Sequence, residues 1–184
     1  GSDADAAIKA AIDAIPAVDF TGYATETYVT EAIAVVNEEV AKKADADKYQ
    51  KQKQAEAEQM IREILKEIAS RQLSDGGFRY WKNSASAHEW ATSMAGEAMT
   101  EALNQGFAVG SGTYQKWIEY QIAQSKSYRH STKNAEDLIQ AYRLYTLALA
   151  GKEQTAYMNR LKEAKKISEQ AKYRLAAAYY IAGK

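Results

Sequence analysis

Apolar residues recur three or four positions apart along most of the 184-residue chain, which is the spacing of one face of an α-helix. The clearest stripe lies between Ala55 and Gln72 and consists of Met60, Ile61, Ile64, Leu65 and Ile68. Such a stripe is typical of an amphipathic helix that packs one face on a core. It predicts a helix that ends near Gln72.

A turn signal follows this helix. Asp75 precedes Gly76 and Gly77. An Asp side chain accepts hydrogen bonds from backbone N–H groups just ahead of it, and glycine adopts a positive φ at little steric cost. The sequence therefore predicts a tight reversal of the chain.

Bulky aromatic side chains come directly after the reversal, at Phe78, Tyr80 and Trp81. They are too apolar for a free loop, so we expect them to pack back against the ends of neighbouring helices. We interpret the segment as a structural corner between helices, not as a linker. The predicted corner consists of Gln72, Asp75, Gly76, Gly77, Phe78, Trp81 and Trp90.

Two further helices are predicted before residue 133. Ser86 and Glu89 have capping-box spacing, so we expect Ser86 to start the first one and Gly106 to end it. Its expected core face is Trp90, Met94, Ala98, Met99 and Leu103. The second helix has an apolar face of Tyr114, Trp117, Ile118 and Ile122. We expect the polar run 125–133 to be a loop.

The last third contains an internal repeat. An Ala-Tyr-Arg-Leu run starting at Ala141 recurs as Lys-Tyr-Arg-Leu starting at Lys172, and both copies end in Ala-Gly-Lys. This displacement of 31 to 32 residues suits one helical hairpin. Both copies are apolar almost all round, which predicts inner helices. The helix between them, around Leu161, is one-sided and is expected on the outside.

The N-terminal region has a different pattern. Residues 3–15 predict a short helix that Pro16 ends. A second predicted helix carries the 4-3-4 spacing of a coiled-coil seam at Val29, Ile33, Val36 and Val40. This seam predicts that the chain can form an oligomer through residues 29–40. Residues 18–33 also resemble a linker of phage tail fibres that precedes a coiled coil.

The apolar stripe is lost at residues 42–48, where we place a boundary. The predicted organisation is an N-terminal helical arm at 1–48, which is fused or oligomerising, and a helical domain at 49–184. The initial Gly1-Ser2 is typical of a cleavage scar, so a signal or lipid anchor could have preceded it.

Composition supports an all-α protein, because helix formers dominate and Pro16 is the single proline. No run approaches the eighteen or so apolar residues of a membrane span. The chain has no cysteine, which excludes disulfides, thiolate metal sites and cysteine nucleophiles. Its net charge is zero, but residues 1–48 are acidic and residues 139–184 are basic. The basic residues are interleaved with apolar ones, so we expect solvated helix faces and no nucleic-acid partner.

Residue types with catalytic chemistry are present without a motif. His88 and His130 are the two histidines, and neither has a nearby set of metal ligands. Carboxylate pairs for glycoside hydrolysis could be composed from Asp75, Glu89, Glu97 and Glu101, but such pairs occur in any helical protein. The turn explains Asp75, and the helix cap explains Glu89. We therefore predict no catalytic, cofactor-binding or metal-binding residues.

The corner, with Gln at a helix end followed by Asp-Gly-Gly-Phe and Trp, resembles the corners of α/α toroids, in which helical hairpins form a ring. A narrower resemblance extends over residues 57–184. Several segments resemble, in order and spacing, the thioester-domain region of bacterial alpha-2-macroglobulins, particularly those of Bacteroidetes. These segments are 72–81, 89–107, 140–151, 158–161 and 170–179. The resemblance implies helical hairpins of an incomplete α/α toroid.

In that family a Cys-x-Glu-Gln motif forms a thioester that captures an attacking protease. The nearest segment in this chain, 56–59, reads Glu-Ala-Glu-Gln and lacks the thiol, so we interpret it as an ordinary helix surface. The resemblance implies a non-enzymatic scaffold or protein-interaction fragment of a protease-trapping protein. Its implied partners are proteases or other domains of a larger chain, and its implied location is the cell envelope or periplasm. Alternatives are an oligomerising structural module and, less favoured, an α/α-toroid hydrolase or lyase.

Overall fold

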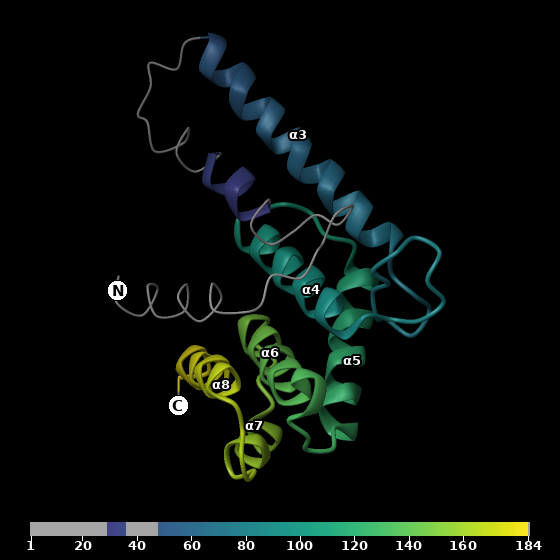
Figure 1. Cartoon of the computed structure of the whole chain (residues 1–184). Coiled ribbons are helices and arrows are strands. Elements are labelled where there is room, and N and C mark those ends of the chain that lie inside the picture. Colours follow the sequence, from purple (N-terminus) through teal and green to yellow (C-terminus); the bar gives the residue numbers. More distant parts are fainter. Residues whose placement is uncertain (1–28, 36–47, 184) are drawn as a thin grey trace.

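The computed structural model describes residues 29–35 and 48–183, and Figure 1 shows the chain. The described part is all-α, with one isolated bridge between Gln72 and Phe78. Residues 29–35 are helical. The other elements are α3 (Lys48–Ser70), α4 (Glu89–Asn104), α5 (Ser111–Ser127), the 3-10 turn η1 (Lys133–Ala135), α6 (Glu136–Leu149), α7 (Thr155–Lys162) and α8 (Glu169–Ile181). None of these helices is long and apolar enough to cross a membrane.

The helices are arranged in two rows. The inner row consists of α4, α6 and α8, in which α6 packs against both of its neighbours. The outer row consists of α3, α5 and α7. Helix α5 packs on α4 and α6, α7 packs on α6 and α8, and α3 packs on α4. This alternation of inner and outer helices confirms the predicted helical hairpins of an α/α toroid.

Two apolar clusters fill the spaces between the rows. The first joins residues 29–35, α3, the corner, α4 and α5, and includes Val29, Ile61, Ile68, Phe78, Met99 and Trp117. The second joins the start of α4 with α6, α7 and α8, and includes Trp90, Tyr142, Leu144, Met158, Leu161 and Leu175. The predicted α3 stripe is confirmed, because Ile61, Ile64, Leu65 and Ile68 are buried. Met60, the remaining member, is partly buried against the same cluster.

Two positions of the predicted coiled-coil seam lie inside this core. Val29 and Ile33 are 1% and 3% exposed and pack in the first cluster. Val36 and Val40 lie outside the described residues, as does most of the stretch 42–48. The chain itself therefore covers the described part of the seam, and the division at residue 48 stays a prediction.

Several local expectations were wrong. Leu103 is exposed, so it does not belong to the core face of α4. Helix α5 continues to Ser127, so the polar run at 125–133 begins inside a helix, where Ser125 is buried. Helix α8 is apolar in sequence but is not buried on all sides, because Tyr173 and Tyr180 are exposed. In the described chain α6 has inner-row neighbours on both sides and α8 has one.

The end of α4 is as predicted. Gly106 has a φ of 86° and follows the last residues of the helix. The N–H of Phe107 donates to the carbonyl oxygen of Ala102 at 2.9 Å, and that of Gly106 donates to Leu103 at 3.0 Å. These two bonds form a Schellman motif, which satisfies carbonyl groups that a helix end leaves without partners.

Candidate functional site: the corner and the polar contacts between helices

The turn of the corner is closed by short backbone and side-chain contacts. The N–H of Leu73 donates to the carbonyl oxygen of Gly77 at 2.8 Å, and Asp75 Oδ1 accepts from the N–H of Gly77 at 2.9 Å. Gly76 has a φ of 97°, and a Cβ atom there would lie 2.2 Å from the carbonyl oxygen of Lys116 in α5. Only glycine meets both conditions, so the corner brings its backbone directly against α5.

Gln72 connects the end of α3 to the start of α5. Its backbone forms the bridge with Phe78. Its Nε2 donates to the carbonyl oxygen of Thr113 at 2.9 Å and to that of Gly76 at 3.1 Å. A single amide therefore satisfies carbonyl groups from two elements, and this holds the turn in place on α5.

Phe78 connects the corner to α4. Its ring is fully buried in the first cluster. Its N–H donates to Thr92 Oγ1 at 2.9 Å, and its carbonyl oxygen accepts from the N–H of His88 at 2.8 Å. Packing and hydrogen bonds thus place the residue after the turn against the first turn of α4.

The expectation that all the corner aromatics pack back was wrong for Trp81, which is 59% exposed. Its carbonyl oxygen accepts from the N–H of Ser84 at 3.0 Å, so Trp81 opens a surface turn. Its ring forms a T-shaped pair with that of Tyr80, with the centroids 4.6 Å apart. Trp90 is buried, but it belongs to the second cluster, with its ring centroid 4.5 Å from that of Tyr142. The structure therefore does not bring Trp90 together with Phe78.

Arg71 is a corner residue that the sequence analysis missed. Its guanidinium is buried, bonds Glu67 at 2.8 and 3.0 Å, and donates to the carbonyl oxygen of Tyr80 at 2.6 Å. The hydrogen bond from Arg71 lowers the pKa of the Glu67 carboxyl. The signal was the Glu–Arg spacing of four residues, with the acid first, which stabilises a helix.

The start of α4 also differs from the prediction. The helix begins at Glu89, and its N-cap is His88, whose Nδ1 accepts from the N–H of Ala91 at 3.1 Å. Ser86 lies in the preceding loop. The bond from His88 N–H to Phe78 fixes the chain at residue 88, so the helix starts there. Burial lowers the pKa of His88, and the charge of Glu89 opposes this shift.

Polar contacts between the helices form a seam of Glu89, Tyr120, Gln140 and Arg143, which we call the polar seam. Glu89 accepts from the Tyr120 hydroxyl at 2.5 Å and pairs with Arg143, which also donates to Gln140 Oε1. Gln140 donates to the carbonyl oxygen of Ser125 at 3.2 Å. Burial and the bond to Glu89 raise the pKa of Tyr120. The polar seam joins α4, α5 and α6.

The other carboxylates considered for catalysis also have protein partners. Glu97 accepts from the hydroxyl of Tyr142, and Glu101 accepts from Gln105 Nε2 at 3.1 Å. His130 Nε2 lies 2.7 Å from the carbonyl oxygen of Lys165. Residues 29–35 and 48–183 contain no group of three metal-ligating side chains. Glu97 therefore joins α4 to α6, whereas the bond to Glu101 lies at the end of α4 itself.

The Glu-Gln segment at 56–59 lies in the middle of α3. Glu56 accepts from Gln52 Nε2 at 3.3 Å, and Gln59 Nε2 donates to Glu63 at 3.4 Å. Both side chains are exposed. These contacts are those of a solvated helix face.

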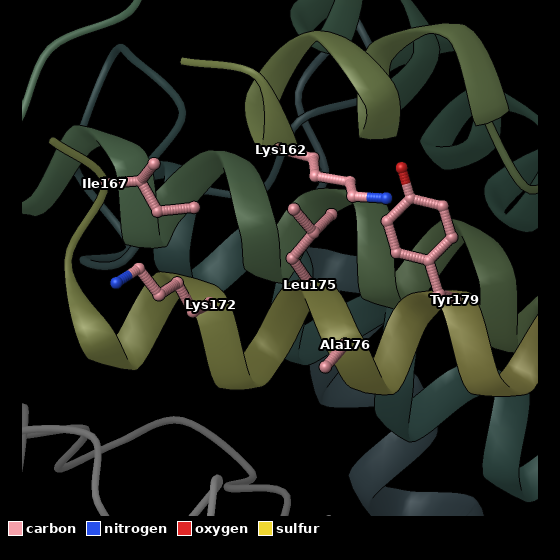
Figure 2. A pocket seen from close by; sticks show the side chains of 6 residues that line it. All are labelled: Lys162, Ile167, Lys172, Leu175, Ala176 and Tyr179. Carbon is pink, nitrogen blue, oxygen red and sulfur yellow. The ribbon is translucent and has the colours of Figure 1, made fainter. Parts of the chain in front are cut away.

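A groove of about 300 Å³ lies between α7 and α8. Figure 2 shows its lining residues, and the amine of Lys162 extends alongside the ring of Tyr179. The amine nitrogen lies 5.6 Å from the ring centroid. A second cavity of about 300 Å³ lies where α3 meets the loop after α4, with Leu65, Met99 and Val109 among its lining residues. Neither cavity contains a residue of the predicted corner.

Comparison with solved structures finds similarity to the alpha-2-macroglobulin of Escherichia coli. The chain matches its crystal structure, which spans domain MG7 to the C-terminus, with a TM-score of 0.68, 17% identity, 98% of this chain covered and 28% of that one. It matches the cryo-EM reconstruction of the native conformation with a TM-score of 0.59, 19% identity and coverage of 98% and 11%. No family model and no curated protein matches the sequence. The likeness is one of fold.

Proposed function

We propose that the chain is a scaffold and protein-interaction segment of an alpha-2-macroglobulin-like protein of the cell envelope. The observation that carries this proposal is the helical array, which matches a region of the Escherichia coli protein over 98% of this chain. The chain spans 28% of the matched crystal structure, so its partners would include other domains of a larger chain.

The contacts of the polar residues support a non-enzymatic role. The sequence contains no cysteine, so its 184 residues cannot form a cysteine thioester. Asp75 closes the corner turn, Glu89 pairs with Arg143, and Glu97 binds Tyr142. Carboxylates held by protein donors are poorly placed to act as a catalytic acid and base on a sugar.

The experiment asks whether the protein captures a protease covalently. The full chain is mixed with trypsin, quenched and analysed by denaturing electrophoresis and intact-mass measurement, and a parallel sample receives methylamine. We expect no adduct that survives denaturation and no methylamine incorporation. A covalent complex with trypsin would contradict the proposal.

A Glu56→Cys variant tests whether segment 56–59 is a degenerate thioester motif. The substitution creates Cys-Ala-Glu-Gln in the middle of α3, where both side chains point into solvent. We expect a free thiol that reacts fully with a thiol reagent and no gain of methylamine. The control is Gln52→Cys, which places a thiol on the same exposed face without the motif. Methylamine uptake by the first variant alone would identify the segment as a degenerate thioester site.

A further inference from the structure

Arg174 is the most completely buried charged side chain that the structure leaves without a polar partner. It belongs to α8 and is 1% exposed. Its guanidinium carbon lies 4.3 Å from the ring centroid of Tyr142 and 4.9 Å from that of Tyr145, both in α6. The two tyrosine rings are stacked, with centroids 6.2 Å apart. The cation therefore lies against a wall of two aromatic rings.

The guanidinium nitrogens are unpaired in the described part of the chain. Nε, Nη1 and Nη2 of Arg174 are all buried, and none has a hydrogen-bond partner there. The internal repeat supplies a comparison, because Arg174 corresponds to Arg143. Arg143 is also buried, but its two terminal nitrogens bond Gln140 and the carboxylate of Glu89. Arg143 in the first copy of the repeat is thus bonded to an anion, whereas Arg174 in the second copy bonds none among residues 29–35 and 48–183.

Aromatic contacts alone do not balance this charge. A guanidinium stays protonated inside a protein, and removing such an ion from water costs more free energy than a desolvated cation–π contact returns. Glu97 accepts from the Tyr142 hydroxyl, at the far end of that ring, and it makes no hydrogen bond with Arg174. The site therefore consists of the Arg174 cation, the flat rings of Tyr142 and Tyr145, and guanidinium N–H groups that make no hydrogen bond.

We propose that Arg174, with Tyr142 and Tyr145, forms a buried carboxylate-binding site between α6 and α8. A carboxylate is planar and accepts two parallel N–H bonds from one guanidinium, and here the face of that guanidinium lies over the tyrosine rings while its N–H groups stay without a partner. The carboxylate could come from two sources. One is a separate molecule, either a small carboxylate or a partner protein that carries a carboxylate side chain. The other is an acidic residue of this chain that precedes Val29, a region that contains Asp3, Asp5, Asp13, Asp19 and Glu26.

The first experiment measures the thermal midpoint of the full chain in sodium acetate and in sodium chloride at equal ionic strength. Acetate is the probe. A ligand that binds only the folded state raises the midpoint, by about 2–4 °C once its concentration is several times Kd. Arg174→Met should abolish this rise. The control is Arg160→Met, because Arg160 is an exposed arginine 5.4 Å from the ring of Tyr157, and it should retain the rise.

The second experiment tests the internal source with a variant in which the five acids before Val29 become Asn or Gln. If one of them occupies the site, the wild type shows no acetate rise, the neutralised variant gains it, and Arg174→Met lowers the midpoint less in that variant than in the wild type.

The proposal is overturned if neither the wild type nor the neutralised chain responds to acetate more than to chloride. This result needs no Arg174 variant to fold. It is also overturned if Arg174→Met leaves both acetate responses intact. If Arg174→Met does not fold, Arg174→Gln takes its place in the same comparison.

Discussion

The indole ring of Trp117 lies in the space that a side chain on Gly96 would occupy. A Cβ atom at Gly96 would come within 1.8 Å of the ring atoms Cε2 and Cζ2. The ring nitrogen donates to the carbonyl oxygen of Thr92 at 2.9 Å, one helical turn earlier. A glycine inside a helix costs about 1 kcal/mol relative to alanine, and here it allows α4 and α5 to pack closely around a fully buried tryptophan.

This relationship predicts that Gly96→Ala destabilises the protein although alanine favours helix. The methyl group would displace the Trp117 ring and break its bond to Thr92, and such overpacking costs about 1–3 kcal/mol. Urea unfolding measures the loss. The control is Gly112→Ala in α5, where a Cβ atom meets nothing within 4 Å, so stability should stay equal or rise. Equal effects at the two glycines would contradict the packing argument.

The corner aromatics should differ sharply in their contribution to stability. Phe78→Ala removes a fully buried ring and should cost about 3–5 kcal/mol. Trp81→Ala removes a larger but mostly exposed ring, so we expect a change within about 0.5 kcal/mol. Chemical denaturation of the two variants is the measurement. A loss at Trp81 comparable to that at Phe78 would mean that the indole is covered in solution.

The sequence predicted what depends on local pattern. The α3 stripe, the reversal at Gly76 and the glycine end of α4 all appear as expected, because periodicity and positive φ are properties of neighbouring residues. The prediction for Trp81 was wrong for a related reason. An aromatic residue looks equally apolar in the sequence whether its side chain packs in the core or lies on a surface turn. Only the path of the chain after Phe78 decides whether the Trp81 side chain is buried or exposed.

Contacts between residues far apart in the sequence could not be predicted from sequence patterns. Ser86 and His88 both precede a plausible helix, and the choice depends on a bond from His88 to Phe78, ten residues earlier. Glu89 and Arg143 are 54 residues apart, so no local sequence spacing predicts that they form an ion pair. The inner helices looked apolar all round, and the polar residues buried among them were explicable only after their partners were known.

The pairing of Glu89 with Arg143 predicts an asymmetric response to mutation. The Arg143 side chain is 5% exposed and that of Glu89 is 32% exposed. Glu89→Gln leaves a buried cation bonded to Gln140 but without an anion and should cost about 3 kcal/mol, whereas Arg143→Met leaves a carboxylate that water can reach and should cost less. Unfolding free energies test this order.

Two comparisons complete the test. The double variant should lose less than the sum of the single losses, because each removes the same interaction. Lys53→Met, which removes one partner of the exposed pair with Glu56, should change stability by about 0.5 kcal/mol or less. A larger loss for Arg143→Met than for Glu89→Gln would contradict the assigned burial of the two groups.

His88 predicts a pH dependence of stability. Its Nδ1 can accept the Ala91 N–H only when it carries no proton, and burial lowers its pKa below the ordinary 6.5. Between the two values the unfolded chain binds a proton that the folded chain does not, so stability rises with pH. The contribution of His88 is therefore complete above about pH 6.5 and is lost as the pH falls toward the lower folded pKa.

Thermal unfolding between pH 5 and 7.5 measures this effect, because the lowered pKa of the Glu67 carboxyl acts only below about 4.5. His88→Asn keeps an N-cap acceptor without a titrating group, so it should flatten the pH profile while costing little stability at pH 7.5. His130→Asn removes the other histidine and should keep the wild-type profile. A profile that His130→Asn flattens and His88→Asn leaves unchanged would assign the titration to the loop after α5, and the cap at α4 would then not be sensitive to pH.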